Sequence, residues 1–258
     1  MAAVTQGAAL PENACWLTFD DGFKDHHRHV LPELLKRNIQ GSFFPAVKPI
    51  MERSILDVHQ VHFILASAGD FGALITDLHY ECKQNGLNDD EVAHLWNTHA
   101  VVSKYDSKEV AYFKRMLQFV LPEHLRNSIT SRLFEKYVKT PQLDFAADLY
   151  MSEDEVKDLV GAGMYVGSHG YKHLWFDKEN KKSQDEEIQQ SLHFLKSIGA
   201  VVKNWIMCYP YGAHNDQTLD LLTEAECAIG LTTQFGQADF RVHHPLKLPR
   251  FDTNDFPQ

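Results

Sequence analysis

The sequence predicts an α/β protein whose parallel strands close, or nearly close, into a barrel. Short apolar runs typical of strands alternate with amphipathic helical stretches near both ends of the chain. That alternation is the pattern of a parallel sheet with helical crossovers. Polar groups suited to chemistry directly follow several of the apolar runs, as they do at the carboxyl ends of barrel strands.

The N-terminal part is expected to contain a strand, a helix and a second strand. Residues 16–19 form the first apolar run, and Gly22 allows the chain to turn sharply after it. Residues 30–35 have helical spacing, and this helix should end near Asn38. Residues 42–44 then read as the second strand.

A capping box opens the C-terminal part. Ser152 is followed three residues later by Glu155, which predicts a helix start. Gly161 and Gly163 should end this helix. Residues 164–167 then form a brief apolar strand bounded by glycine.

The remaining elements repeat the same alternation. They are a helix from a second box at Ser183-xx-Glu186 to Gly199, a strand at 205–207, a helix capped by Asn215, a strand at 228–231 and a final strand at 246–251.

Residues 51–149 break the alternation. Apolar residues recur there at helical spacing, whereas strand signals and glycines are sparse. The helix-spaced segments are 55–65, 71–78, 110–117 and 133–137. We therefore expect one domain over residues 1–258 with an all-helical insertion, at about 51–149, after the second strand. The insertion could form part of a substrate pocket or a dimer surface, and the sequence does not choose between them.

Two adjacent carboxylates, Asp20 and Asp21, stand where the first strand should end. Neighbouring side chains on a strand point to opposite faces. At a strand-to-loop junction this alternation breaks, so both carboxylates can reach one cavity. One could then bind a cation while the other stays free to take a proton. Taken alone, however, Asp-Asp-Gly is more typical of a solvated turn.

Two histidines, His169 and His173, follow the strand at 164–167. If the segment is one turn of helix, both imidazoles share a face and could bind a single ion. Two histidines and one carboxylate are a common protein contribution to a catalytic metal site. Such a pair also arises by chance among fifteen histidines. Its place directly after a strand favours the metal site.

Three ordered motifs of the chain resemble those of the polysaccharide deacetylase family, the NodB-homology carbohydrate esterases. They are Thr18–Gly22, Ser168-His169-xxx-His173 and Tyr209-Pro210-Tyr211-Gly212. The resemblance covers about residues 14–50 and 150–252, but not the segment between them. It implies a distorted, incomplete (β/α) barrel of about seven units.

The resemblance also implies roles for individual residues. Asp21, His169 and His173 would hold a divalent metal, with zinc expected and iron, cobalt, nickel or manganese as alternatives. Asp20 would be the general base for the attacking water, and the backbone N–H of Tyr211 would bind the oxyanion. The chemistry agrees with these roles, because a bound cation lowers the pKa of water from about 15.7 to about 7. A fixed N–H donor stabilises charge that develops only in the transition state.

The chain departs from the family pattern in two places. The third motif usually begins with an arginine that orients the catalytic aspartate, and Cys208 stands there instead. Cys208 is expected to pack as a small apolar residue. Arg250 is our candidate replacement, because its guanidinium fork fits a carboxylate; an exposed arginine on an edge strand is the alternative. The late leucine-histidine motif that supplies the general acid is not clearly present, so the proton donor is unassigned.

Composition limits the partners and the compartment. A net charge of −10 argues against a nucleic-acid surface. No stretch approaches the roughly 20 apolar residues that span a bilayer. Residues 1–13 lack the basic and apolar regions of a signal peptide, and the four cysteines form no CxxC pair. We therefore expect a cytoplasmic protein; its oligomeric state is not predicted.

The predicted function is that of a metal-dependent hydrolase that removes an acyl group, expected to be acetyl, from the nitrogen of an amino sugar. The cytoplasmic location favours a nucleotide-linked or lipid-linked sugar as substrate. Such a sugar would be a precursor of a bacterial surface polysaccharide, as in O-antigen or capsule biosynthesis. One alternative is a hydrolase of another non-peptide C–N bond on the same scaffold, and another is a non-catalytic carbohydrate-binding relative.

Overall fold

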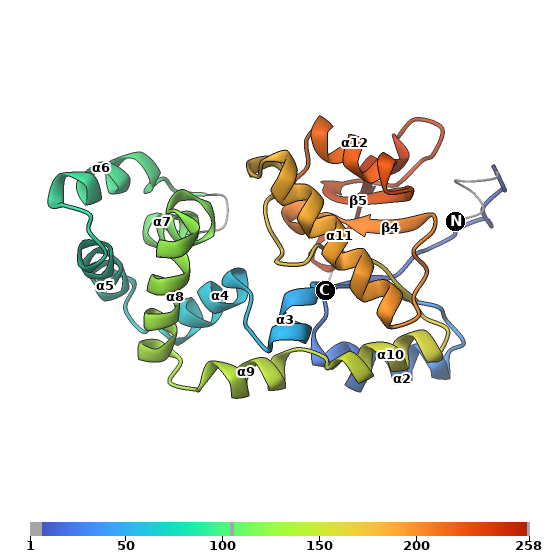
Figure 1. The fold of residues 1–258 in the computed structure, drawn as a ribbon, viewed down its shortest axis with the longest axis horizontal. Coiled ribbons are helices and arrows are strands. Elements are labelled where there is room, and N and C mark those ends of the chain that lie inside the picture. Colours follow the sequence, from blue (N-terminus) through green and yellow to red (C-terminus); the bar gives the residue numbers. More distant parts are fainter. Residues whose placement is uncertain (1–6, 104–105, 257–258) are drawn as a thin grey trace. The chain divides into compact units, whose positions relative to one another are not determined.

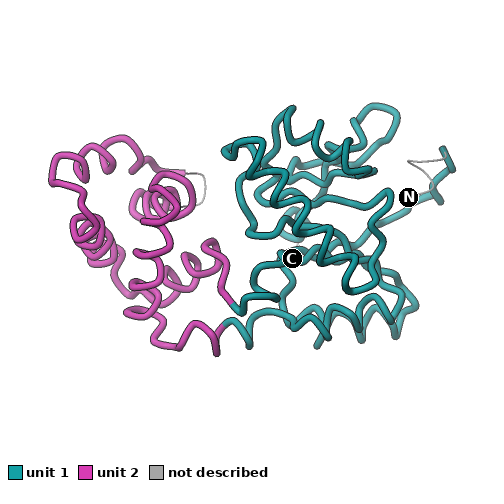
Figure 2. Tube along the Cα trace, in the orientation of Figure 1, with its two compact units in different colours: residues 1–53, 146–258 teal, residues 54–145 magenta. Residues whose placement is uncertain are grey.

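A computed structural model describes residues 7–103 and 106–256 and divides the chain into two compact units (Figures 1 and 2). Unit 1 comprises residues 1–53 and 146–258, and unit 2 comprises residues 54–145. Part of the expectation about the N-terminus concerns residues 1–6, which lie outside the described residues.

Unit 1 contains short parallel strands that alternate with helices along the chain (Figure 1). Its strands are β1 (Thr18–Asp21), β2 (Ser42–Pro45), β3 (Tyr165–Val166), β4 (Trp205–Cys208), β5 (Cys227–Phe235) and β6 (Leu248–Arg250). Its helices are α2 (Leu31–Lys36), α3 (Val47–Glu52), α10 (Glu153–Gly161), α11 (Lys181–Ser197) and α12 (Asp216–Glu224), while α9 (Gln142–Leu149) begins in unit 2 and ends in unit 1. A π-helical turn, His26–Val30, precedes α2, and single 3₁₀ turns occur at Phe176–Lys178, Pro210–Gly212, Pro245–Lys247 and Thr253–Asp255.

The strands follow one another in chain order. They form two three-stranded parallel sheets, β1-β2-β3 and β4-β5-β6. A parallel bridge between Ser168 and Met207 joins the two sheets, and the Cys208 N–H donates to the Ser168 carbonyl at 2.8 Å. Among the described residues, no backbone ladder joins β6 to β1. The predicted distorted, incomplete barrel is thus confirmed.

Side-chain alternation along the strands separates two apolar layers. Phe43 belongs to the cluster that includes residues of α2, α10 and α11, outside the sheet. Phe44, the next residue of β2, belongs to a different cluster with Ile206, Cys208 and Leu231. This second cluster lies on the opposite face of the sheet, as alternation requires. Cys208 is therefore a barrel-interior residue.

Capping side chains mark where α10, α11 and α12 begin. At α10 the predicted box is present: Ser152 Oγ accepts from the Glu155 N–H, and Glu155 Oε2 accepts from the Ser152 N–H. The predicted start of α11 at Ser183 is wrong by about one turn. Asn180 caps this helix by accepting the Ser183 N–H, because asparagine is as good an N-cap as serine.

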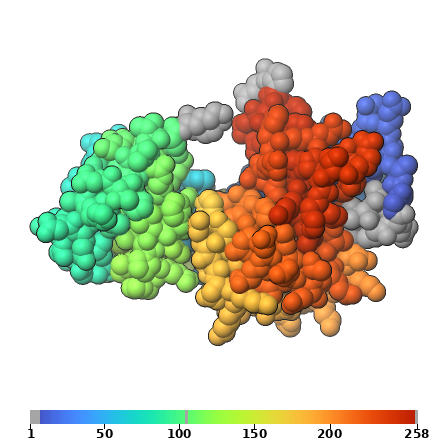
Figure 3. Space-filling view, turned by 90° about the horizontal axis from the view of Figure 1, so that it is seen from above, coloured from blue at the N-terminus to red at the C-terminus, as the bar shows by residue number. Residues whose placement is uncertain are grey.

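Unit 2 is helical throughout its described regular structure, and the predicted helical insertion after the second strand is confirmed. Its complete α-helices are α4 (Asp57–Ser67), α5 (Phe71–Gln84), α6 (Asp89–His99), α7 (Lys108–Arg115) and α8 (Glu123–Tyr137), and a π-helical turn, Met116–Val120, follows α7. Figure 3 shows unit 2 in a space-filling view, where its atoms are coloured cyan to green. No helix in the described part of the chain is both long and apolar enough to cross a membrane. The interpretation of residues 1–258 as one domain stays a prediction.

Candidate active site

The six site residues predicted from the sequence all lie at or just beyond the carboxyl ends of strands in unit 1. They are Asp20 and Asp21 of β1, His169 and His173 after β3, Tyr211 after β4 and Arg250 of β6. Parallel strands present these ends at one edge of the sheet, which is where loop-borne chemistry collects in such folds.

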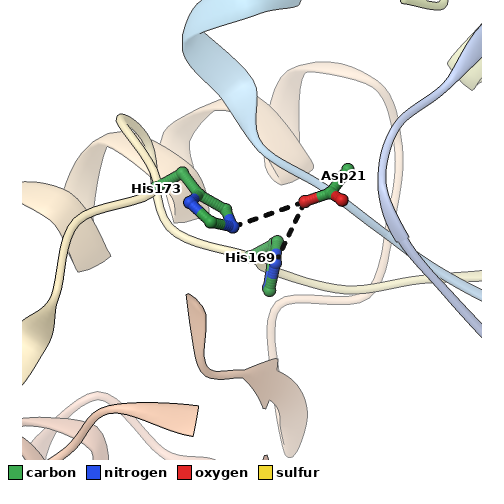
Figure 4. Close-up of side chains that lie close together, drawn as sticks. All are labelled: Asp21, His169 and His173. Atoms are coloured by element: carbon green, nitrogen blue, oxygen red, sulfur yellow. Dashed lines mark ion pairs between the residues drawn. The ribbon is translucent and has the colours of Figure 1, made fainter. Parts of the chain in front are cut away.

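Three of these side chains converge on one point (Figure 4). Asp21 Oδ1 lies 3.4 Å from His169 Nε2 and 3.4 Å from His173 Nε2. One donor atom from each residue lies within 4.8 Å of the others. Both histidines are buried: 3% of the surface of His169 and 8% of that of His173 is exposed. Two imidazole nitrogens and one carboxylate oxygen are a donor set that fits zinc and related divalent cations.

The backbone that carries these residues is not the helical turn considered from the sequence. The histidines lie in a loop, where Gly170 has φ 75° and His173 has φ 62°. Asp21 is also left-handed, with φ 71°, and this breaks the alternation of β1. Non-glycine residues enter this region at a cost of about 1–3 kcal/mol. The surrounding structure must therefore impose the conformation.

A hydrogen bond orients the ring of His169. Its Nδ1 lies 2.7 Å from the carbonyl oxygen of Cys208, so the ring donates through Nδ1. The lone pair is then left on Nε2, which faces Asp21, and such partners orient metal-binding histidines in general. The ring of His173 packs against the ring of Tyr211, with 4.7 Å between the ring centroids. The ring of Trp175 also stacks on Tyr211, with 4.0 Å between the centroids.

Asp20 is not one of the three converging donors and pairs with Arg250 instead. The guanidinium donates to both carboxylate oxygens, at 3.1 and 2.9 Å, and also to Thr18 Oγ1 and the Thr232 carbonyl. Cys208 Sγ donates to Asp20 Oδ2 at 3.3 Å. Burial raises the pKa of Asp20. The charge of His169 when that ring is protonated, the charge of Arg250, and the hydrogen bonds from Arg250 and Cys208 outweigh burial, so this pKa lies below its ordinary value.

Tyr211 occupies a tight turn after β4. Its backbone is left-handed, with φ 58° and ψ 6°, and Gly212 continues the turn with φ 71°. A Cβ at Gly212 would lie 2.3 Å from Thr233 Oγ1. Thr233 Oγ1 also donates to the Tyr211 carbonyl at 3.2 Å. The turn is thus fixed by a close approach that only glycine permits.

Sequence reasoning missed two contributors to this site. Cys208 was expected only to pack, yet its thiol contacts Asp20 and its carbonyl orients His169. Trp175 was not singled out, and its position two residues after His173 was the available signal. The histidines near the C-terminus bond within their own turn: His243 Nδ1 accepts from the Asp239 N–H and His244 Nδ1 accepts from the Leu246 N–H.

Comparison with known proteins gives a family match and structural relatives. A family model described as polysaccharide deacetylase matches residues 97–229, a span that includes His169, His173 and Tyr211. The chain is similar to the Streptococcus pyogenes deacetylase PplD in complex with acetate, with 14% identity and a TM-score of 0.55 over 96% of this chain and 68% of that one. It is also similar to the BpsB deacetylase domain from Bordetella bronchiseptica, with 15% identity and a TM-score of 0.52 over 96% of this chain and 74% of that one. At these identities the structural similarity shows a shared fold. None of the curated protein sequences compared with the chain matches it.

Proposed function

Because the chain belongs to the polysaccharide deacetylase family, we propose that it is a metal-dependent hydrolase that removes an acetyl group from the nitrogen of an amino sugar. One observation carries the proposal: Asp21, His169 and His173 converge within 4.8 Å beside a second carboxylate, Asp20, that Arg250 holds separately. Such an arrangement supplies a metal site and a separate proton acceptor, which together suit metal-assisted hydrolysis of an amide.

Asp21, His169 and His173 would hold the metal, and zinc is the ion we propose. A divalent cation at this position would lower the pKa of water and polarise the carbonyl of the acetamide group. The orientation of His169 through the Cys208 carbonyl supports this role, because it directs Nε2 toward the shared point.

Asp20 would act as the general base. Its lowered pKa keeps the carboxylate ionised near neutral pH, so it can accept a proton from the attacking water. Arg250 fixes the plane of the carboxylate through two hydrogen bonds, and each oxygen retains lone-pair capacity for a further proton. Arg250 is thus proposed as the residue that orients the base in place of the arginine missing at position 208.

The backbone N–H of Tyr211 would stabilise the oxyanion. The turn at residues 210–212 packs closely against Thr233, which supports a fixed orientation of this N–H. A donor that is already oriented is more effective than one that must reorganise during the reaction. The adjacent ring of Tyr211, stacked with Trp175, would border the bound sugar.

The substrate that we propose is a nucleotide-linked or lipid-linked N-acetylated amino sugar, used in the cytoplasm to build a bacterial surface polysaccharide. The family supports a carbohydrate substrate in general. Acetate release should be measured from three kinds of substrate: nucleotide-linked sugar, lipid-linked sugar and an N-acetylated oligosaccharide. Release from the oligosaccharide alone would contradict the precursor assignment. A different acid or amide product would instead indicate a hydrolase of another C–N bond.

Asp20→Asn tests the catalytic assignment. This variant should bind the metal with wild-type stoichiometry and lose acetate release by about 10²–10⁴-fold, because the general base is gone. Asp25→Asn is the matched control, since Asp25 lies five positions away on the exposed surface and pairs only loosely with His29, at 3.7 Å. Wild-type turnover by a folded Asp20→Asn protein would contradict the assignment. So would a metal-loaded wild-type protein that releases acetate from none of the three substrates.

A further inference from the structure

The backbone N–H and carbonyl groups of the loop between the two histidines form hydrogen bonds with several parts of unit 1. Residues 170–172 separate His169 from His173. Ser168 Oγ accepts the Gly170 N–H at 3.1 Å. The first two N–H groups of α3 donate to the carbonyls on this loop, from Val47 to Gly170 at 3.3 Å and from Lys48 to Tyr171 at 2.8 Å.

The two remaining N–H groups of the loop meet a buried carboxylate from α11. Glu187 Oε2 accepts from the N–H of Tyr171 and from the N–H of Lys172, both at 2.8 Å. Only 3% of Glu187 is exposed. A Cβ at position 170 would lie 3.1 Å from this same oxygen, so glycine allows the loop to approach the carboxylate closely. The proposed mechanism gives Glu187 no role.

Burying an ionised carboxylate costs free energy, and this cost raises its pKa. Burial raises the pKa of Glu187 to about 7, although the hydrogen bonds from Lys172 and Tyr171 and the charge of Lys172 oppose that rise. An apolar residue at this helix position would avoid the cost but would leave two N–H groups of the loop without their acceptor.

We propose that Glu187 is a positioning residue for the metal centre: it holds the backbone of residues 170–172 in the path that brings His169 and His173 to Asp21. The inference rests on the proposed function, because it assigns Glu187 to the same metal site. His173 has φ 62°, which is unfavourable for a residue other than glycine and persists only where the surrounding structure holds it. Zinc–nitrogen bonds are about 2.0–2.1 Å long, so a small displacement of either ring weakens the site.

Metal binding by the purified protein tests this directly. Zinc affinity should be measured by competition with a chelator, and the cobalt(II) absorption spectrum should report the coordination geometry. Glu187→Ala should weaken zinc binding by about 10–100-fold, the usual effect of losing a residue that orients metal ligands. Glu187→Gln keeps an oxygen acceptor for both N–H groups, so it should retain more affinity than the alanine variant and a wild-type cobalt spectrum.

Ser191→Ala is the matched structural control. Ser191 is buried on the same helix, and its hydroxyl donates at 2.8 Å to the backbone carbonyl of Glu187, not to the loop. This variant should lose stability without losing zinc affinity. If Glu187→Ala fails to fold, Glu187→Asp takes its place, because a side chain shorter by one methylene cannot reach both N–H groups.

The possible results separate the two proposals. A folded Glu187→Ala or Glu187→Asp protein with wild-type zinc affinity and cobalt spectrum would overturn the inference and leave the proposed function intact. Equal losses of affinity in Glu187→Gln and Glu187→Ala would overturn it as well, since the acceptor geometry would not matter. A wild-type protein that binds no divalent metal would overturn the proposed function and this inference together.

Discussion

Replacing Arg250 by glutamine removes the charge that holds Asp20. Arg250 donates to both oxygens of Asp20, and the two side chains are 18% and 27% exposed. Breaking a buried ion pair by removing one partner costs about 3–5 kcal/mol. Because this pair retains some contact with solvent, we expect Arg250→Gln to lower the free energy of unfolding by about 3 kcal/mol, the low end of that range.

The same substitution should raise the pKa of Asp20. Burial already raises this pKa, and Arg250 is one of the groups that lower it. A carboxylate with a lowered folded-state pKa contributes stability above its unfolded pKa, and the contribution is lost as pH falls through the folded value. The stability difference between wild type and Arg250→Gln should therefore be largest near neutral pH and should shrink in acid. The acid limb of the kcat/KM profile should move to higher pH.

Arg241→Gln provides the matched control. Arg241 also donates to both oxygens of an aspartate, Asp239, but it lies on the surface with its side chain 88% exposed. Exposed ion pairs contribute little, so this variant should resemble wild type in chemical denaturation and in its pH profile. The reasoning is refuted if Arg250→Gln is as stable as Arg241→Gln and its acid limb does not move.

Two further predictions concern stability. Gly22→Ala should destabilise the protein more than Gly163→Ala in chemical denaturation: both glycines have φ +80°, but a Cβ at Gly22 would lie 2.8 Å from Pro45 Cβ whereas a Cβ at Gly163 meets nothing within 4 Å. Both variants should incur about 1–2 kcal/mol for the left-handed backbone, and equal losses would show that the overlap with Pro45 is relieved without cost. In metal-free protein, burial raises the pKa of Glu187 from 4.5 to about 7. The folded protein therefore holds this proton more tightly than the unfolded chain. The resulting stabilisation is complete below about pH 4.5 and is lost as pH rises to 7. As pH rises across that window, the free energy of unfolding of wild type should fall by about 3 kcal/mol relative to that of Glu187→Gln, because glutamine does not titrate. A difference between the two proteins that does not change with pH would contradict the assignment.

Much of the fold could be predicted because its signals are local. The alternation of strands and helices depends on periodicities within a few residues, and the capping box at Ser152 acts over a single turn. The start of α11 was misplaced because two adequate capping residues, Asn180 and Ser183, lie three positions apart. Only the packed helix decides which of them is used.

The sequence alone predicted which residue types stand at the strand ends: the Asp20-Asp21 pair, the two histidines and the Pro-Tyr-Gly turn. It did not determine that Arg250 reaches Asp20 across 230 positions, because that contact depends on how the open barrel brings β6 near β1. Nor did it determine the path of the histidine loop, since left-handed residues are unfavourable locally and persist only where neighbours such as Glu187 hold them. Short-range preferences fix the elements and supply the reactive groups, whereas contacts between distant segments decide where those groups meet.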